Sequence, residues 1–193
     1  MCGIFGQNAP ISGFQFHTLN ASLNHRGPDD GQMRASNDMS LFHARLAIVD
    51  SVGGKQPMER GNLCIVFNGE IYNHLELRKG HNLDCQSRSD TETLLALFEK
   101  YGEAMLNLLD GMFAFCIFNK ENRKLFLARD RMGEKPMYIY HKGERFAFAS
   151  ELNTLAAFFD LEVNEESLKE FLVKGWVGPV SCKRMGRAKT HRV

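Results

Sequence analysis

Apolar positions along the chain repeat with two different periods, and the changes of period divide it into predicted strands and helices. The run 112–118 is apolar on both alternating faces, which predicts a strand covered on two sides within a layered sandwich. Apolar runs bounded by turn residues predict strands at 2–6, 41–49, 63–67, 112–118, 124–129, 136–140 and 145–150. Apolar residues three and four apart predict helices at 14–24, 151–159 and 165–174.

Two further helices are predicted from their start signals. Asn73 with Glu76, and Ser89 with Glu92, have the spacing of a capping box, so a helix is expected to begin at each pair. Asp90 then lies in the first turn of the second helix. Before these helices, Asn68-Gly69 is expected to end the strand that starts at residue 63.

Length and charge narrow the classes of function. A chain of 193 residues with 44% hydrophobic residues can bury one good core but is short for two. Lys and Arg number 24 against 23 Asp and Glu, a net charge of +1, which gives no electrostatic footprint for nucleic acid or an anionic membrane. Small-molecule chemistry is therefore the better starting hypothesis.

The spacing of the cysteines and histidines favours a protein of a reducing compartment that holds no structural metal. The five cysteines are widely spaced, and the seven histidines show no HExxH spacing, so we expect no metal site. No apolar run approaches the length of about 20 residues that a membrane span needs. Gly53-Gly54-Lys55 lacks the spacing of a phosphate-binding loop and is interpreted as a turn. These features predict a cytoplasmic protein.

Cys2 is the candidate nucleophile. Cleavage of Met1 would leave a residue with both a thiol and a free α-amine, whose reference pKa of about 7.7–8.0 suits a general base. The alternative is a buried cysteine that happens to stand second, since free cysteine is among the most buried residue types. Position alone does not decide between the two, so the assignment of Cys2 as a nucleophile depends on other residues that would act with it.

Several motifs occur in register with that cysteine. They are Met1-Cys2-Gly3-Ile4-Phe5-Gly6, His25-Arg26-Gly27-Pro28-Asp29, Arg45-Leu46-Ala47-Ile48-Val49-Asp50, Asn68-Gly69-Glu70-Ile71-Tyr72-Asn73, Ser89-Asp90-Thr91-Glu92, Asp110-Gly111-Met112-Phe113-Ala114-Phe115 and Arg129-Asp130-Arg131-Met132-Gly133-Glu134-Lys135-Pro136. Over roughly residues 1–180 the chain resembles the class II glutamine amidotransferases, most closely the N-terminal domain of glutamine-hydrolysing asparagine synthetases. The first five of these motifs in order with an N-terminal cysteine, reinforced by the last two, make coincidence a poor explanation.

The resemblance implies an α+β fold, the N-terminal nucleophile hydrolase sandwich, in which two stacked antiparallel sheets carry helices on both outer faces. It also implies that the cysteine attacks the side-chain amide of glutamine, and that water then hydrolyses a γ-glutamyl thioester. Asn68 and Gly69 match the family's oxyanion hole, a side-chain amide and a backbone N–H. An ordinary Asn-Gly turn would explain the same dipeptide.

The substrate pocket is also carried over from the resemblance. Arg45 matches the clamp on the glutamine α-carboxylate, and the backbone of Ile48 and Val49 lines the same pocket. Asp90 and Glu70 match the acidic partners of the α-ammonium. For Arg45 the alternative is a surface arginine, and for Asp90 it is compensation of the helix dipole.

In asparagine synthetases a second domain uses ATP and Mg²⁺ to activate aspartate and receives the ammonia. This chain has no Ser-Gly-Gly-x-Asp-Ser loop, so no cofactor is expected in it. We predict a glutaminase domain at 1–180 and a basic, unstructured tail at 181–193. An exposed boundary around Phe171, Trp176 and Val177 is expected to hold a synthetase subunit or a second copy.

Three explanations of the chain stay open: a truncated or frame-shifted synthetase, a stand-alone glutaminase that feeds a partner, or a non-catalytic binding module. The set of Cys2, Arg45, Asn68, Gly69 and Asp90 argues against the last. An amidotransferase with another acceptor, such as a sugar phosphate, is the further alternative. The sequence of this half does not identify the ammonia acceptor.

Overall fold

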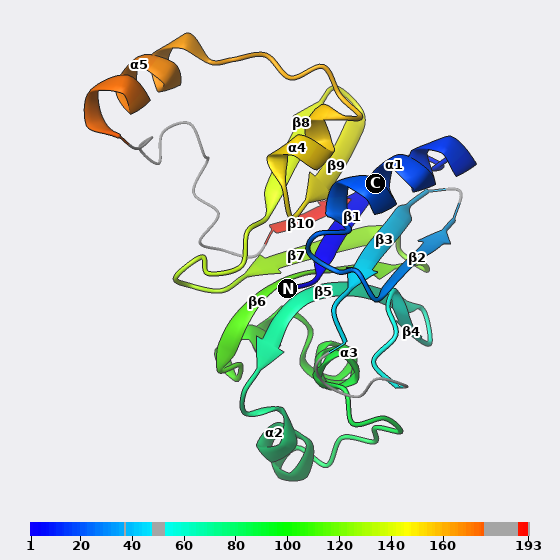
Figure 1. Ribbon diagram of the computed structural model, residues 1–193. Helices are drawn as coiled ribbons and strands as arrows, with labels where there is room; N and C mark the ends of the chain where they lie inside the picture. Colours follow the sequence, from blue (N-terminus) through cyan, green and yellow to red (C-terminus); the bar gives the residue numbers. More distant parts are fainter. Residues whose placement is uncertain (37, 48–52, 176–188, 193) are drawn as a thin grey trace.

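The chain folds into two stacked antiparallel sheets (Figure 1). The computed structural model describes residues 1–36, 38–47, 53–175 and 189–192. The first sheet has the order β2-β3-β1-β9-β8 and the second the order β10-β7-β6-β5-β4. The strands are β1 Gly3–Gln7, β2 Asp30–Ala35, β3 Ser40–Arg45, β4 Met58–Arg60, β5 Leu63–Ile71, β6 Gly111–Asn119, β7 Lys124–Arg129, β8 Tyr138–Lys142, β9 Arg145–Ala149 and β10 Lys189–Arg192.

Helices cover the outer face of each sheet. α1 (Gly13–Leu23) and α4 (Leu152–Ala156) pack against the first sheet. On the second sheet lie α3 (Asp90–Tyr101) and, beside it, α2 (His74–Gly80) and the 3₁₀ helix η1 (Gly102–Asn107). α5 (Glu165–Lys174) stands away from both sheets (Figure 1).

Three apolar clusters hold these layers together. The cluster between the sheets joins Ile4 and Phe148 of the first sheet to Val66 and Cys116 of the second. A second cluster packs α3 against β5 and β6, and a third packs α1 against β1 and β3. The order is therefore helix, sheet, sheet, helix, which confirms the predicted α+β sandwich.

β5 ends later than predicted, because its pairing with β6, and not the Asn-Gly dipeptide, decides where it ends. β5 continues through Asn68-Gly69 to Ile71, since Gly69 pairs with Phe113 and Ile71 with Gly111 of β6. The interpretation of Asn68-Gly69 as a strand end is wrong. β2 and β4 were not predicted, and both are edge strands of mostly polar sequence.

α2 and α3 begin where predicted, but the predicted capping boxes are not what starts them. The Ser89 side chain accepts a hydrogen bond from the Thr91 N–H, while the Glu92 carboxylate accepts from the N–H groups of Gln86 and Ser87. Asn73 makes no side-chain cap. These pairs are therefore not capping boxes. The capping box that the structure does contain, Ser12 with Gln15, begins α1.

Part of the predicted tail is ordered. Residues 189–192 form β10, which pairs antiparallel with β7, so the prediction of an unstructured end is wrong for these four residues. The outer edge of β7 offers backbone groups that an extended segment can pair whatever its side chains, and basic composition does not prevent this. Residues 181–188 and 193 lie outside the described residues.

Candidate active site

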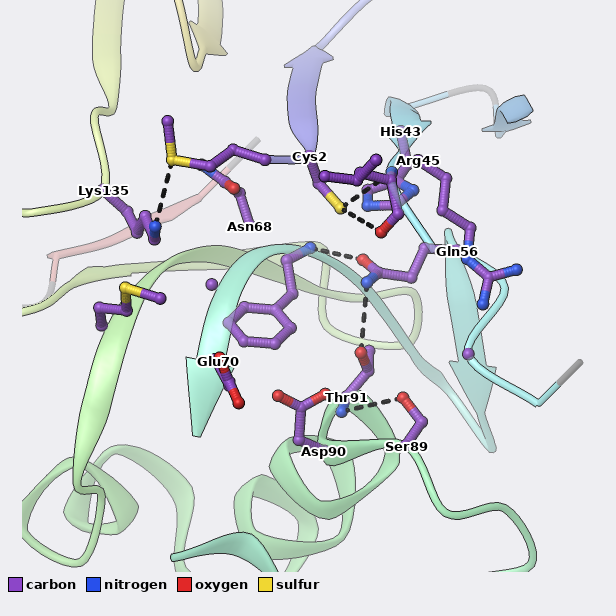
Figure 2. Close-up of a pocket in the computed structure, with 16 residues that line it drawn as sticks. Cys2, His43, Arg45, Gln56, Asn68, Glu70, Ser89, Asp90, Thr91 and Lys135 are labelled. Atoms are coloured by element: carbon purple, nitrogen blue, oxygen red, sulfur yellow. Dashed lines mark hydrogen bonds between the residues drawn. The ribbon is translucent and has the colours of Figure 1, made fainter. Parts of the chain in front are cut away.

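A small cavity of about 100 Å³ opens where one end of the first sheet meets the second sheet and α3. Cys2 and Arg45 reach it from β1 and β3, Asn68 to Glu70 from β5, and Asp90 from the start of α3 (Figure 2). Residues from sequence positions far apart thus share one pocket. The fold brings six of the predicted site residues to it: Cys2, Arg45, Asn68, Gly69, Glu70 and Asp90.

Backbone contacts hold the Cys2 thiol in place. Its Sγ lies 3.4 Å from the N–H of Leu46 and 3.6 Å from the Leu46 carbonyl oxygen. Nε of Arg26 donates to the Cys2 carbonyl at 3.0 Å, which fixes the main chain on the other side. Because β1 pairs with β3 through Gly3 and Ala44, Cys2 lies at the Arg45 end of that ladder.

The thiol is protonated at rest. Burial raises the pKa of Cys2, and this outweighs the lowering by the Leu46 hydrogen bond, the N-terminal amine and Arg45. A neutral thiol is a poor nucleophile. Attack through this sulfur therefore requires a base that accepts its proton during the reaction.

Asn68 carries an unused hydrogen-bond donor. The residue is 1% exposed, and among the described residues its Nδ2 has no hydrogen-bond partner. A buried amide donor left without a partner costs about 1–3 kcal/mol. Such a group inside a pocket is suited to bind an oxygen of a ligand, and Figure 2 shows Asn68 on the same side of the pocket as Cys2.

Gly69 is required by the packing of β5 on β6. A Cβ at this position would lie 2.2 Å from the Met112 carbonyl oxygen and 2.8 Å from Cα of Phe113. Both are backbone atoms of the neighbouring strand and cannot move aside cheaply. The backbone at Gly69 therefore approaches β6 more closely than any other residue would allow.

The pocket carries charges of both signs. Arg45 is 7% exposed at the end of β3, and Asp90 is 6% exposed at the start of α3. Oδ2 of Asp90 accepts a hydrogen bond from the Ile71 N–H at 3.1 Å, and burial raises the pKa of this carboxyl. A guanidinium and carboxylates around one small cavity suit a zwitterionic amino acid. Ile48 and Val49 lie outside the described residues.

The comparison with known sequences decides the family. Residues 1–184 match the glutamine amidotransferase domain. The chain belongs to this family.

Relatives of the amidotransferase domain are longer proteins. A putative asparagine synthetase [glutamine-hydrolyzing] 2 of Methanocaldococcus jannaschii is 35% identical over 92% of this chain and 40% of its own length. Asparagine synthetase [glutamine-hydrolyzing] 1 of Bacillus subtilis is 39% identical over 80% of this chain and 25% of its own length. The chain thus spans less than half the length of these two relatives.

Solved structures agree with the fold. Glutamine phosphoribosylpyrophosphate amidotransferase from B. subtilis superimposes with a TM-score of 0.67 over 80% of this chain and 43% of its own, at 22% identity. A second structure, described as the allosteric regulatory enzyme of purine biosynthesis, gives a TM-score of 0.64 at 21% identity. The sandwich of the amidotransferase domain is therefore that of the N-terminal nucleophile amidotransferases.

Sequence reasoning missed three buried polar residues that line the pocket. Gln56 is 6% exposed and lies between β5 and α3. His43 is 1% exposed, and burial lowers its pKa to about 3, so the ring is neutral. Lys135 is 6% exposed, with Nζ 3.2 Å from Sδ of Met1. Alternation along 41–49 could have placed His43 on the same face as Arg45.

The described residues contain no group of three or more His, Cys, Asp or Glu side chains placed to hold a metal ion. Within the same part of the chain, no helix is long and apolar enough to cross a membrane. The four cysteines of that part, Cys2, Cys64, Cys85 and Cys116, are free thiols.

Proposed function

We propose that this glutamine amidotransferase domain hydrolyses L-glutamine to L-glutamate and ammonia, with Cys2 as the nucleophile. The single observation that carries the proposal is Asn68 Nδ2, which has no hydrogen-bond partner among the described residues and lies in the same pocket as the Cys2 thiol. A hydrogen-bond donor left unsatisfied beside a nucleophile is what stabilisation of a developing oxyanion requires.

The pocket binds the amino-acid end of glutamine through its charges. Arg45 pairs with the α-carboxylate, a role that suits the planar fork of the guanidinium. Asp90 and Glu70 accept hydrogen bonds from the α-ammonium. Ile48 and Val49, outside the described residues, are assigned to glutamine binding from the sequence motif alone. The side-chain carboxamide of the substrate is then directed toward Cys2.

Removal of Met1 supplies the base. The freed α-amine of Cys2 takes the thiol proton as Sγ attacks the carboxamide carbon. The carbonyl oxygen becomes an oxyanion that accepts hydrogen bonds from Asn68 Nδ2 and the Gly69 N–H. Collapse of this intermediate breaks the C–N bond, and the α-ammonium returns its proton to the leaving nitrogen, which departs as ammonia. Water then attacks the γ-glutamyl thioester and releases glutamate and the thiol.

The ammonia is proposed to serve asparagine synthesis from aspartate and ATP in a synthetase domain or subunit. The names of the relatives support this acceptor. ATP and Mg²⁺ would act there, and no residue of this chain is assigned to them. An acceptor such as a sugar phosphate is the second candidate, and a non-catalytic glutamine-binding module the third. Free cysteines in the described chain support a reducing, cytoplasmic location.

Release of ammonia and glutamate from glutamine by the purified chain tests the proposal. We expect equal amounts of both products, and no asparagine when ATP and aspartate are added. Intact-mass spectrometry of the same sample should show a chain that starts at Cys2. Glutamine binding without product would favour the binding module, and full activity with Met1 retained would refute the α-amine as base.

A further inference from the structure

We infer that Gln56 is a positioning residue that sets the separation between the oxyanion donor Asn68 and the ammonium-binding Asp90. This inference rests on the proposed function and deepens it, since the hydrogen bonds of Gln56 go to Phe67 and Thr91 and not to Cys2, Asn68 or Asp90 themselves. Its side chain joins the strand that carries Asn68 to the helix that carries Asp90.

The two hydrogen bonds of Gln56 reach the immediate neighbours of those residues. Its Oε1 accepts from the Phe67 N–H at 2.6 Å, and its Nε2 donates to Thr91 Oγ1 at 3.2 Å. Phe67 precedes Asn68 on β5, and Thr91 follows Asp90 on α3. Figure 2 shows the amide of Gln56 with both bonds, at the edge of the pocket.

The edge of β5 explains why a side chain is used here. β4 pairs with β5 only over the three positions from Leu63 to Ile65. Beyond that pairing, the next main-chain donor on this edge is the Phe67 N–H, and Gln56 Oε1 accepts its hydrogen bond. The bridge therefore replaces a strand partner at the point where β5 enters the pocket.

A second bridge crosses the same gap farther along. Oδ2 of Asp90 accepts from the Ile71 N–H at 3.1 Å. β5 and the start of α3 are thus joined on both sides of Asn68, once through Gln56 and once through Asp90 itself. Because Gln56 is 6% exposed and Thr91 2% exposed, water does not readily replace the first bridge.

The chemistry of the amide makes Gln56 hard to replace. It accepts from a main-chain N–H and donates to a hydroxyl at the same time, and an apolar side chain of the same length can do neither. Loss of the bridge leaves Asn68 and Asp90 chemically unchanged but lets the strand and the helix that carry them shift relative to each other. A misplacement of about 1 Å can cost on the order of 10²-fold in rate.

The test compares Gln56→Met, Thr91→Val and the double variant in steady-state glutamine hydrolysis, with circular dichroism to confirm folding. Gln56→Met is expected to lower kcat/KM about 10- to 100-fold. Thr91→Val removes only the hydroxyl of the same bridge and should lower it by a smaller factor. The double variant should lose no more than Gln56→Met alone, because both changes break one connection.

Gln15→Met is the matched control. Gln15 also accepts a backbone N–H, that of Ser12, but at the start of α1 and away from the pocket. It should lower the Tm and leave kcat/KM unchanged. If Gln56→Met does not fold, Thr91→Val alone decides the result. Wild-type kinetics in the Gln56 and Thr91 variants, or multiplicative losses in the double variant, would overturn the inference. A wild-type chain without glutamine hydrolysis would instead contradict the proposed function.

Discussion

At the scale of single residues, the pocket holds groups in states that folding alone would not favour. Burial keeps the Cys2 thiol neutral and raises the pKa of Asp90, and Asn68 leaves a donor without a described partner. The buried carboxylate of Asp90 and the amide donor of Asn68 each cost stability in the absence of a ligand. Their gathering in one small cavity is characteristic of a site shaped for chemistry.

Cys2→Ala is expected to abolish glutamine hydrolysis and to leave the fold and glutamine binding largely intact. The thiol is small, its proposed role is covalent, and Arg45 and Asp90 hold the other end of the substrate. Cys85→Ala is the control, because Cys85 is also a partly buried free thiol but lies outside the pocket. Product release and calorimetric titration with glutamine measure the two effects. Normal turnover of Cys2→Ala would remove Cys2 from the mechanism.

Asp90→Asn should raise the KM for glutamine about tenfold or more without loss of stability at neutral pH. The lost charge-assisted hydrogen bond to the substrate is worth roughly 1.5–3 kcal/mol. Because the folded pKa of Asp90 is raised, its contribution to stability is fully present below the unfolded pKa and is lost as the pH rises through the folded pKa. Wild type should therefore lose stability relative to Asp90→Asn over that pH range.

Asp130 serves as the control, because its pKa is shifted in the opposite direction to that of Asp90. Burial acts to raise the pKa of its carboxyl, but hydrogen bonds from the N–H groups of Lys135, Glu134 and Phe113 lower it below its usual range. Its stabilisation is present above the unfolded pKa and is lost as the pH falls through the folded pKa. Urea unfolding across pH should show Asp130→Asn destabilised at neutral pH. Equal behaviour of the two variants would contradict both assignments.

At the scale of elements, the junction of β5 with β6 and α3 fixes the pocket. β5 runs without a break past Asn68 and Gly69, held by its pairing to β6. The segment before α3 is tied down by Glu92, whose carboxylate accepts hydrogen bonds from Gln86 and Ser87. Asn68 and Gly69, the proposed oxyanion donors, therefore lie on a rigid strand rather than a mobile turn.

Gly69→Ala is expected to destabilise the fold by about 1–3 kcal/mol, the usual range for an overpacked site. The new Cβ would lie 2.2 Å from the Met112 carbonyl oxygen, so β5 and β6 must separate. Turnover should fall with it, because the Gly69 N–H moves. Gly80→Ala is the matched control, since nothing lies within 4 Å of its Cβ. Denaturant unfolding measures both, and equal stabilities would show that the strands adjust freely.

At the scale of the whole molecule, the site exists because two sheets meet. Cys2 and Arg45 come from the first sheet, Asn68 and Gly69 from the second, and Asp90 from the helix behind it. The apolar cluster between the sheets sets their separation. Away from this body, α5 exposes Leu168, Phe171 and Leu172, at 45%, 50% and 74%.

The exposed residues of α5 are expected to drive self-association, or binding to a synthetase subunit, since an exposed apolar patch is often a protein–protein interaction site. Of the predicted boundary residues, Trp176 and Val177 lie outside the described chain. Sedimentation of the wild type should show concentration-dependent association that Phe171→Ser/Leu172→Ser abolishes while glutamine hydrolysis is kept. Lys169→Ser, on the same helix, should change neither. A wild type that stays monomeric at high concentration would count against self-association.

Most of the layered fold could be predicted from the amino-acid sequence alone. Continuous apolar runs placed β1, β6, β7 and β9 closely, because strands buried on both faces are apolar at successive positions, and the spacing of apolar residues by three and four placed α5. The edge strands β2, β4 and β10 escaped prediction, since polar residues at a sheet edge leave no such period. Each of these strands pairs with its neighbour through backbone groups, and no local sequence pattern identifies that neighbour.

At the site, the motifs identified the residue types. Their burial and their hydrogen-bond partners, on which their chemistry depends, follow from the tertiary structure. Burial from both sheets keeps the Cys2 thiol neutral and leaves Asn68 Nδ2 without a described partner. Gln56, which bridges Phe67 and Thr91, had no signal of its own in the sequence. Hydrogen bonds between segments far apart in the chain depend on which surfaces pack together, and only the folded molecule specifies that.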